Sequence, residues 1–92
     1  MLRITVQRNV ASIVLILEGK LAGAWVLELR RLWDRLRSGG EEENLVLTLT
    51  DVSGIDVQGR ELLAEMYAGG ARLEGSGIAV TALIAGVTKS RQ

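Results

Sequence analysis

A chain of 92 residues, 48% of them hydrophobic, can build one domain around one core. It contains neither cysteine nor histidine, which excludes disulfides, thiolate nucleophiles, the commonest metal ligands and the usual general base near neutral pH. The sequence therefore predicts a single non-enzymatic domain, with no cofactor and no metal site.

The charges of the chain balance. Eleven basic and eleven acidic residues give zero net charge, so no overall field attracts nucleic acid or an anionic membrane surface. The apolar stretch at residues 10–17 is too short to span a bilayer, and the amino terminus lacks the order of regions found in signal peptides. We expect a cytoplasmic protein without nucleic-acid binding or direct membrane insertion. A nearly neutral surface also favours association, with a protein partner or as a homodimer.

The first half of the chain shows two strand patterns and then a helical one. Apolar and polar side chains alternate in residues 2–7, which is typical of an edge strand with one solvated face. Residues 12–17 form a nearly continuous apolar run, which predicts a central strand covered on both faces. Residues 25–37 have apolar side chains at helical spacing, namely Trp25, Leu29, Leu32, Trp33 and Leu36.

The second half repeats the alternation of strand and helix. Residues 45–50 and 71–74 are predicted strands, and residues 56–68 form a helix with four side chains facing inward: Leu62, Leu63, Met66 and Tyr67. Both predicted helices run into a Gly-Gly pair, which supplies a left-handed stop. Residues 78–87 fit a strand or a helix, and we favour a helix.

The resulting order is β-β-α-β-α-β-α. Strands that alternate with helices call for parallel pairing through crossover connections. The predicted fold class is therefore α/β, a single domain with a mixed, mostly parallel four-stranded sheet and helices packed on it.

Ligands and partners of such open sheets are met beyond the carboxyl ends of the parallel strands. Two predicted loops, residues 18–23 and 51–56, leave strands at that end. Asp56 directly precedes a helix, where a carboxylate can accept hydrogen bonds from free backbone amides. Asp51 and Ser53 fit a turn as well as a binding surface.

With these residues in view, the chain resembles the STAS family, the sulfate transporter and anti-sigma factor antagonist domains. The family shares this order of elements, a Gly-x-Leu element after the second strand, and a hallmark of the form D-L-S-x-x-D-S-S-G-L before the second helix. The counterparts here are Gly19-Lys20-Leu21 and the stretch from Asp51 to Arg60, and the resemblance extends from residue 2 to about residue 83. It implies a partner-binding surface made of ten residues: Gly19, Lys20, Leu21, Asp51, Ser53, Gly54, Asp56, Val57, Gln58 and Gly59.

One position departs from the family pattern. In anti-sigma factor antagonists the first serine after the hallmark aspartate is phosphorylated by a partner kinase, and the added charge releases the complex. That position is Val57, and neither Val57 nor Gln58 has a hydroxyl, so a switch of about −1.5 to −2 charges cannot operate here. The resemblance implies a protein-interaction module without that switch. Its partner would be an anti-sigma factor of the histidine-kinase-like ATPase type, or a component of a regulatory or transport assembly.

Two other functions compete with this one. A receiver-like phosphoacceptor would be phosphorylated on Asp51, with Glu18 helping to hold magnesium. Receivers also need an acidic pair after the first strand and a lysine after a later one, and this chain supplies neither convincingly. A hydrolase would use Asp51 and Asp56 as an acid-base pair, although both belong to one predicted turn.

The first predicted helix carries two tryptophans and several charged residues. Trp25 and Trp33 lie on its apolar side, which indicates packing in the core or at an interface. Leu27 falls among charged side chains and should be exposed. The helix also carries four arginines, namely Arg30, Arg31, Arg35 and Arg37. Because Glu28 and Asp34 are interleaved with them, the pattern predicts a solvated, salt-bridged face rather than a nucleic-acid site.

Overall fold

The structure of residues 1–89, a computed structural model, has the predicted order of elements. The strands are β1 (Leu2–Arg8), β2 (Ile13–Leu21), β3 (Leu45–Ile55) and β4 (Arg72–Glu74), and the helices are α1 (Ala24–Ser38), α2 (Val57–Ala68) and α3 (Ile78–Lys89). A 3-10 turn, η1 (Glu42–Asn44), precedes β3. The ambiguous last segment is a helix, as we favoured.

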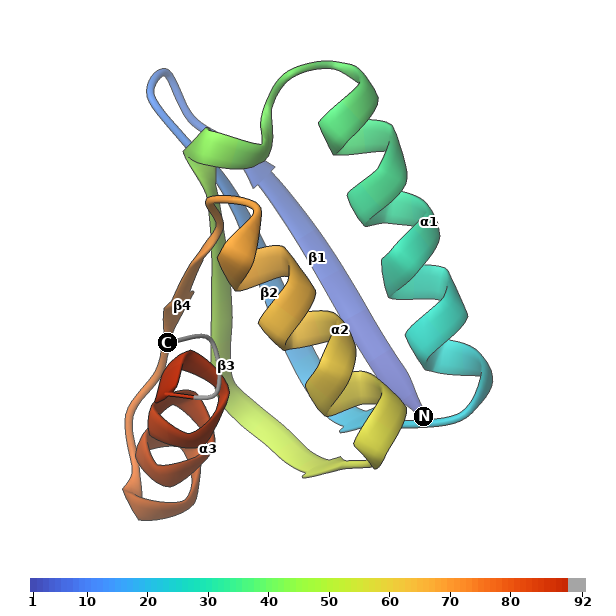
Figure 1. Ribbon diagram of the computed structural model, residues 1–92, viewed down its shortest axis with the longest axis vertical. Coiled ribbons are helices and arrows are strands. Elements are labelled where there is room, and N and C mark those ends of the chain that lie inside the picture. Colours follow the sequence, from blue (N-terminus) through green and yellow to red (C-terminus); the bar gives the residue numbers. More distant parts are fainter. Residues whose placement is uncertain (90–92) are drawn as a thin grey trace.

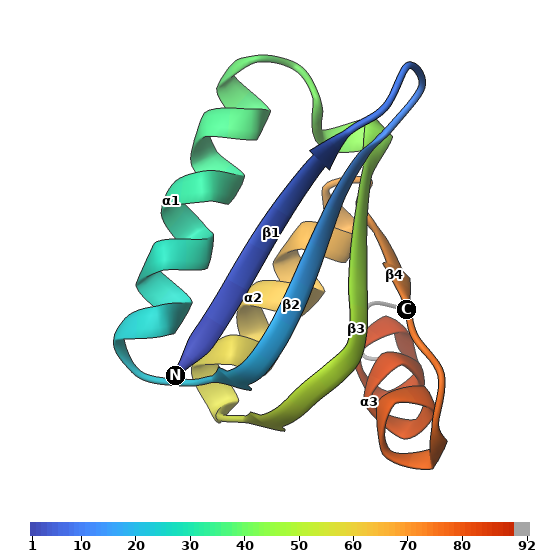
Figure 2. The same cartoon turned by 180° about the vertical axis from the view of Figure 1, so that it is seen from behind.

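The strands form one mixed sheet in the order β1-β2-β3-β4. β1 is antiparallel to β2, whereas β2, β3 and β4 are parallel, which confirms the predicted fold class. α1 and α2 cover one face of the sheet (Figure 1). In the view from behind, β1, β2 and β3 pass in front of α2 (Figure 2).

β2 is central, as predicted, but it is not covered on both faces. Ile13, Leu15 and Leu17 are buried beneath the helices, whereas Val14 and Ile16 on the other face are only half-buried. The β-branched side chains of the open face are shielded by their cross-strand neighbours instead of by a second layer, since such pairs contact each other directly.

The core lies between the sheet and the two helices. α1 buries Val26, Leu29, Trp33 and Leu36, and α2 buries Leu62, Leu63 and Met66. Two side chains are more exposed than a core position requires. Tyr67, predicted to face inward, is 39% exposed, so that prediction is wrong; Trp25 is 37% exposed, which contradicts the core alternative for it but not the interface alternative. Each lies next in sequence to a buried residue, about 100° around the helix from it. The exposure predicted for Leu27, by contrast, is confirmed at 55%.

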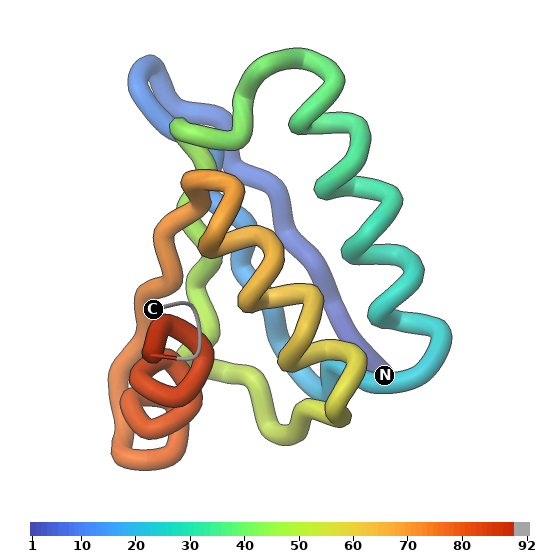
Figure 3. Tube along the Cα trace, viewed as in Figure 1, coloured from blue at the N-terminus to red at the C-terminus, as the bar shows by residue number. Residues whose placement is uncertain are grey.

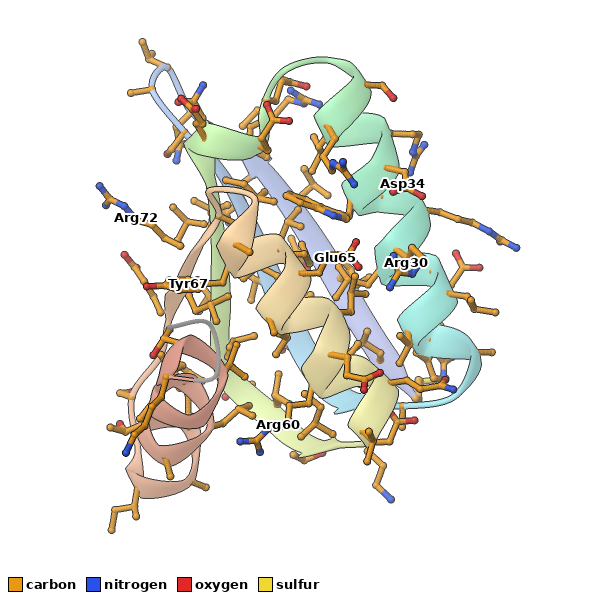
Figure 4. The ribbon with its side chains drawn as sticks, viewed as in Figure 1. Arg30, Asp34, Arg60, Glu65, Tyr67 and Arg72 are labelled. Carbon is orange, nitrogen blue, oxygen red and sulfur yellow. The ribbon has the colours of Figure 1, made fainter. Side chains whose placement is uncertain are left out.

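The helices end and pair as their sequences predict. The second glycine of each pair is left-handed, with φ of 72° at Gly40 and 112° at Gly70. On α1, Arg31 forms an ion pair with Glu28 at 2.9 Å. Arg30 reaches across to Glu65 of α2 at 3.0 Å, and the two side chains face each other between the helices (Figure 4).

Within residues 1–89, no helix combines the length and apolar character needed to cross a membrane.

Candidate functional site

The carboxyl ends of β2 and β3 carry the candidate site, and their pairing is irregular there. Ile16 lies opposite Thr48 and Glu18 opposite Asp51; after Gly19 and Val52, Lys20 lies opposite Gly54. β3 therefore has an extra residue in each of two steps. Such β-bulges increase the local twist and re-aim side chains.

The predicted loops at residues 18–23 and 51–56 are thus mostly strand. β2 extends to Leu21 and β3 to Ile55, so Asp51 and Ser53 lie in a strand and not in a turn. The reason is that cross-strand pairing satisfies the backbone groups that a turn would otherwise have to satisfy locally. Ser53 is the extra residue of the second bulge and is exposed.

Asp56 joins the starts of two helices. It is the N-cap of α2, where its Oδ1 accepts a hydrogen bond from the Gly59 N–H at 2.7 Å. Its Oδ2 accepts from the N–H of Gly23, the residue just before α1, at 3.0 Å. The predicted cap is therefore confirmed. The second bond was not predicted, because the two residues are 33 positions apart in the chain.

These bonds also set the charge state of Asp56. The N–H groups of Gly23 and then Gly59 favour the ionised carboxylate, which lowers the pKa of Asp56 below its usual value. Both oxygens already accept from backbone donors, so Asp56 is poorly placed to take a proton near neutral pH as a general base would.

Gly59 lets α2 begin directly against the end of β2. It is buried, and a Cβ at this position would lie 2.6 Å from the Leu21 carbonyl oxygen and 3.0 Å from Ile55 Cγ1. The Asp56 N–H donates to that same Leu21 carbonyl at 3.2 Å. Leu21, Asp56 and Gly59 therefore fix the direction in which α2 leaves the sheet.

Gly19 and Lys20 lie beside the amino terminus. Gly19 has a φ of 106°, and a Cβ there would overlap the Met1 carbonyl oxygen. The Lys20 N–H donates to that oxygen at 2.9 Å. The exposed Lys20 side chain runs along Gly54, whose Cβ position is 3.4 Å from Lys20 Cγ.

The predicted site residues therefore form a framework with an exposed surface. Leu21, Asp56 and Gly59 provide the framework, while Val57, 71% exposed, and the exposed Gln58 and Lys20 provide the surface. We call this surface the helix-start corner. It lies at the end of the sheet opposite the β1–β2 hairpin (Figure 3).

Three of the predicted residues, Asp51, Ser53 and Gly54, belong to the last part of β3 and not to this corner, although Gly54 lies against the Lys20 side chain. Asp51 is exposed in β3, opposite Glu18. Ser53 and Gly54 form one wall of a shallow pocket of about 130 Å³, whose other wall is made by Ala79, Val80 and Leu83 of α3. The contribution of α3 was missed, and no sequence pattern indicated it. In the described part of the chain, no three acidic side chains gather in a way that could hold a metal ion.

No protein-family model and no curated protein matches the sequence, but solved structures do. An uncharacterised protein of the DUF3478 family from Shewanella loihica PV-4, described as having a SpoIIAA-like fold, is 15% identical, with a TM-score of 0.58 over 85% of this chain and 70% of that one. A protein called Mglu is 29% identical, with a TM-score of 0.61 over 80% of this chain. The match spans only 19% of the Mglu chain. At the level of the fold, the resemblance to STAS domains is confirmed.

Proposed function

We propose that this chain, a domain with the SpoIIAA-like fold, is a non-catalytic protein-interaction module of the anti-sigma factor antagonist type that lacks the serine phosphorylation switch. It acts in the cytoplasm and presents the helix-start corner to a protein partner. The observation that carries the proposal is the pair of hydrogen bonds from Gly23 and Gly59 to the Asp56 carboxylate.

A corner held in this way is suited to binding. Surfaces that are already ordered lose less conformational freedom when a partner docks. The exposed Val57 offers apolar area, and Lys20 and Gln58 are polar groups around it. An apolar centre with a polar rim is the usual arrangement of protein interfaces.

The corner can bind but cannot be switched by phosphate at residue 57. Val57 is the first residue of α2, where free N–H groups and the helix dipole would favour a phosphate. Its side chain has no oxygen to accept one. By resemblance, the partner is an anti-sigma factor of the histidine-kinase-like ATPase type, and binding at this corner persists when that partner holds ATP.

The proposal predicts that Val57→Asp weakens the complex. Aspartate suits the first turn of a helix, so the fold should be kept while an unpaired charge enters the interface. The dissociation constant for purified histidine-kinase-like anti-sigma factors from the same genome, measured by calorimetry, should increase at least about tenfold.

Val10→Asp is the matched control. Val10 is fully exposed in the turn between β1 and β2, and this hairpin lies at the other end of the sheet (Figure 1). The same change of charge there should leave the affinity unaltered. In a second arm, the partner should use ATP to phosphorylate the Val57→Ser variant. The phosphorylated variant should then dissociate from the partner. Equal losses in both aspartate variants, or no binding of the wild type to any such partner, would contradict the proposal.

A further inference from the structure

β1 leaves one edge of the sheet open. It is seven residues long and pairs with β2 without any register shift, and no further strand of the described chain pairs with it. β4, at the opposite edge, has only three residues. An open edge strand presents unpaired N–H and C=O groups that another strand can satisfy, and β1 contains no proline or lysine to prevent this.

Two hydrogen bonds show which backbone groups of β1 point outward. The Lys20 N–H donates to the Met1 carbonyl at 2.9 Å, and the Asn9 N–H donates to the Ser12 carbonyl at 2.8 Å. Antiparallel bonds alternate along a strand, so the odd-numbered residues of β1 bond to β2. The N–H and C=O groups of the even-numbered residues, Leu2 to Arg8, therefore point to the open edge.

Exposed apolar side chains flank this edge. Val6 is 43% exposed and Trp25 of α1 is 37% exposed. At helical spacing, Trp25 and the half-buried Leu32 lie on the side of α1 away from Arg30, which faces α2 through Glu65 (Figure 4). They consequently lie toward β1, where an added strand would shield them from water.

We propose that β1 pairs antiparallel with β1 of a second copy of this chain, which joins the two sheets into one. The strand is complementary to itself about Thr5. With Thr5 opposite its own copy, Ile4 faces Val6, Arg3 faces Gln7 and Leu2 faces Arg8 of the second copy.

This register agrees with the length of β1, with the direction of its outward backbone groups and with the preferences of cross-strand side-chain pairs. It is the antiparallel alignment that pairs all seven residues, and it brings the outward N–H and C=O groups of both strands together. Thr-Thr and apolar pairs are favourable across strands, whereas like charges are not. A register shifted by four residues would place the two Arg3 side chains opposite each other.

The charges favour a second copy as the occupant. The net charge of zero means that two copies do not repel each other as highly charged chains do. Arg8 is already paired with Glu41 at 3.0 Å, and Arg3 lies opposite Glu18 of its own sheet. The dimer does not depend on the proposed function, because Val57 and Gln58 belong to α2 and not to this edge.

Sedimentation velocity over a wide range of concentrations tests the dimer. The wild type should shift from the mass of one chain to that of two, and Val6→Lys should remain a monomer because a lysine on an edge strand opposes pairing. Val10→Lys adds the same charge in the hairpin and should dimerise like the wild type. A wild type that stays monomeric throughout would overturn the proposal.

Single cysteines test the register, since the chain contains none of its own. Opposed residues of a non-hydrogen-bonded pair have Cα atoms about 4.5 Å apart, within reach of a disulfide. Under mild oxidation Thr5→Cys should cross-link to itself, and Gln7→Cys should cross-link only when mixed with Arg3→Cys. Val10→Cys is the control for random collision, and cross-linking as rapid as that of Thr5→Cys would overturn the proposal.

Discussion

At the scale of single residues, Asp56 connects the starts of two helices. One carboxylate binds the N–H of Gly59 in its own helix and the N–H of Gly23, 33 residues away. The first bond is an ordinary cap, and the second is a tertiary contact made by the same side chain. Together the two bonds tie the start of α2 to the start of α1.

We expect Asp56→Asn to separate these two contacts. Asparagine can still cap Gly59 through its Oδ1, because it is as good an N-cap as aspartate. Its amide nitrogen would then face the Gly23 N–H, so two donors would oppose each other. The variant should be less stable than the wild type to urea at pH 7, and amide exchange should accelerate at Gly23 more than at Gly59.

The same variant should also change the response to acid. The pKa of Asp56 is lowered in the folded state, so its contribution is fully present above the unfolded pKa of about 3.9 and is lost as the pH falls through the folded value. Urea titrations at several pH values should show the stability difference shrinking below about pH 4. Asp34→Asn, at an exposed position on α1, is the control. A difference that stays constant from neutral to acid pH would contradict this account.

Gly59→Ala should be destabilising although alanine is the better helix former. The new methyl group would meet the Leu21 carbonyl at 2.6 Å and Ile55 Cγ1 at 3.0 Å, so α2 must move away from β2. Overpacking of this kind costs about 1–3 kcal/mol in the free energy of unfolding. Urea denaturation should show the loss, and Gln58→Ala, an exposed change in the same turn, should have little effect.

At the scale of elements, β3 behaves as two different segments. In its first half Leu45, Leu47 and Leu49 are completely buried and alternate with more exposed residues. In its second half the two bulges end this alternation and turn Thr50 and Asp51 both outward. The regular half builds the core, and the irregular half delivers the chain to the start of α2.

Leu47→Ala should show how much the regular half contributes. Leu47 is fully buried and pairs with Leu15 on one side and Leu73 on the other. Truncating a buried leucine costs about 2–5 kcal/mol, which is a large share of the stability of a small domain. Thr48→Ala, next to it on the open face, should cost much less, and a similar loss for both in chemical denaturation would mean that the open face is also packed.

At the scale of the whole molecule, the helices cover only one face of the sheet and leave β1 as an open edge. One face and one edge of a small sheet are therefore available, in addition to the helix-start corner. These surfaces lie on different parts of the fold, so a dimer through β1 and a partner at the corner are compatible. Partner binding can therefore be measured with the cross-linked Thr5→Cys dimer, which should bind the partner at the helix-start corner of each copy.

The sequence by itself determined the order of the elements, the helix stops, the cap at Asp56 and the missing hydroxyl at Val57, because periodicity, capping and residue identity are local properties. The tertiary structure decided where β2 and β3 end, where Trp25 and Tyr67 point, that one face of β2 stays open, and that Asp56 also holds Gly23. Each of these depends on contacts between segments far apart in the chain. In these regions backbone groups and side chains form hydrogen bonds and packing contacts with residues that are distant in the sequence. Local sequence patterns do not indicate which distant residues these are.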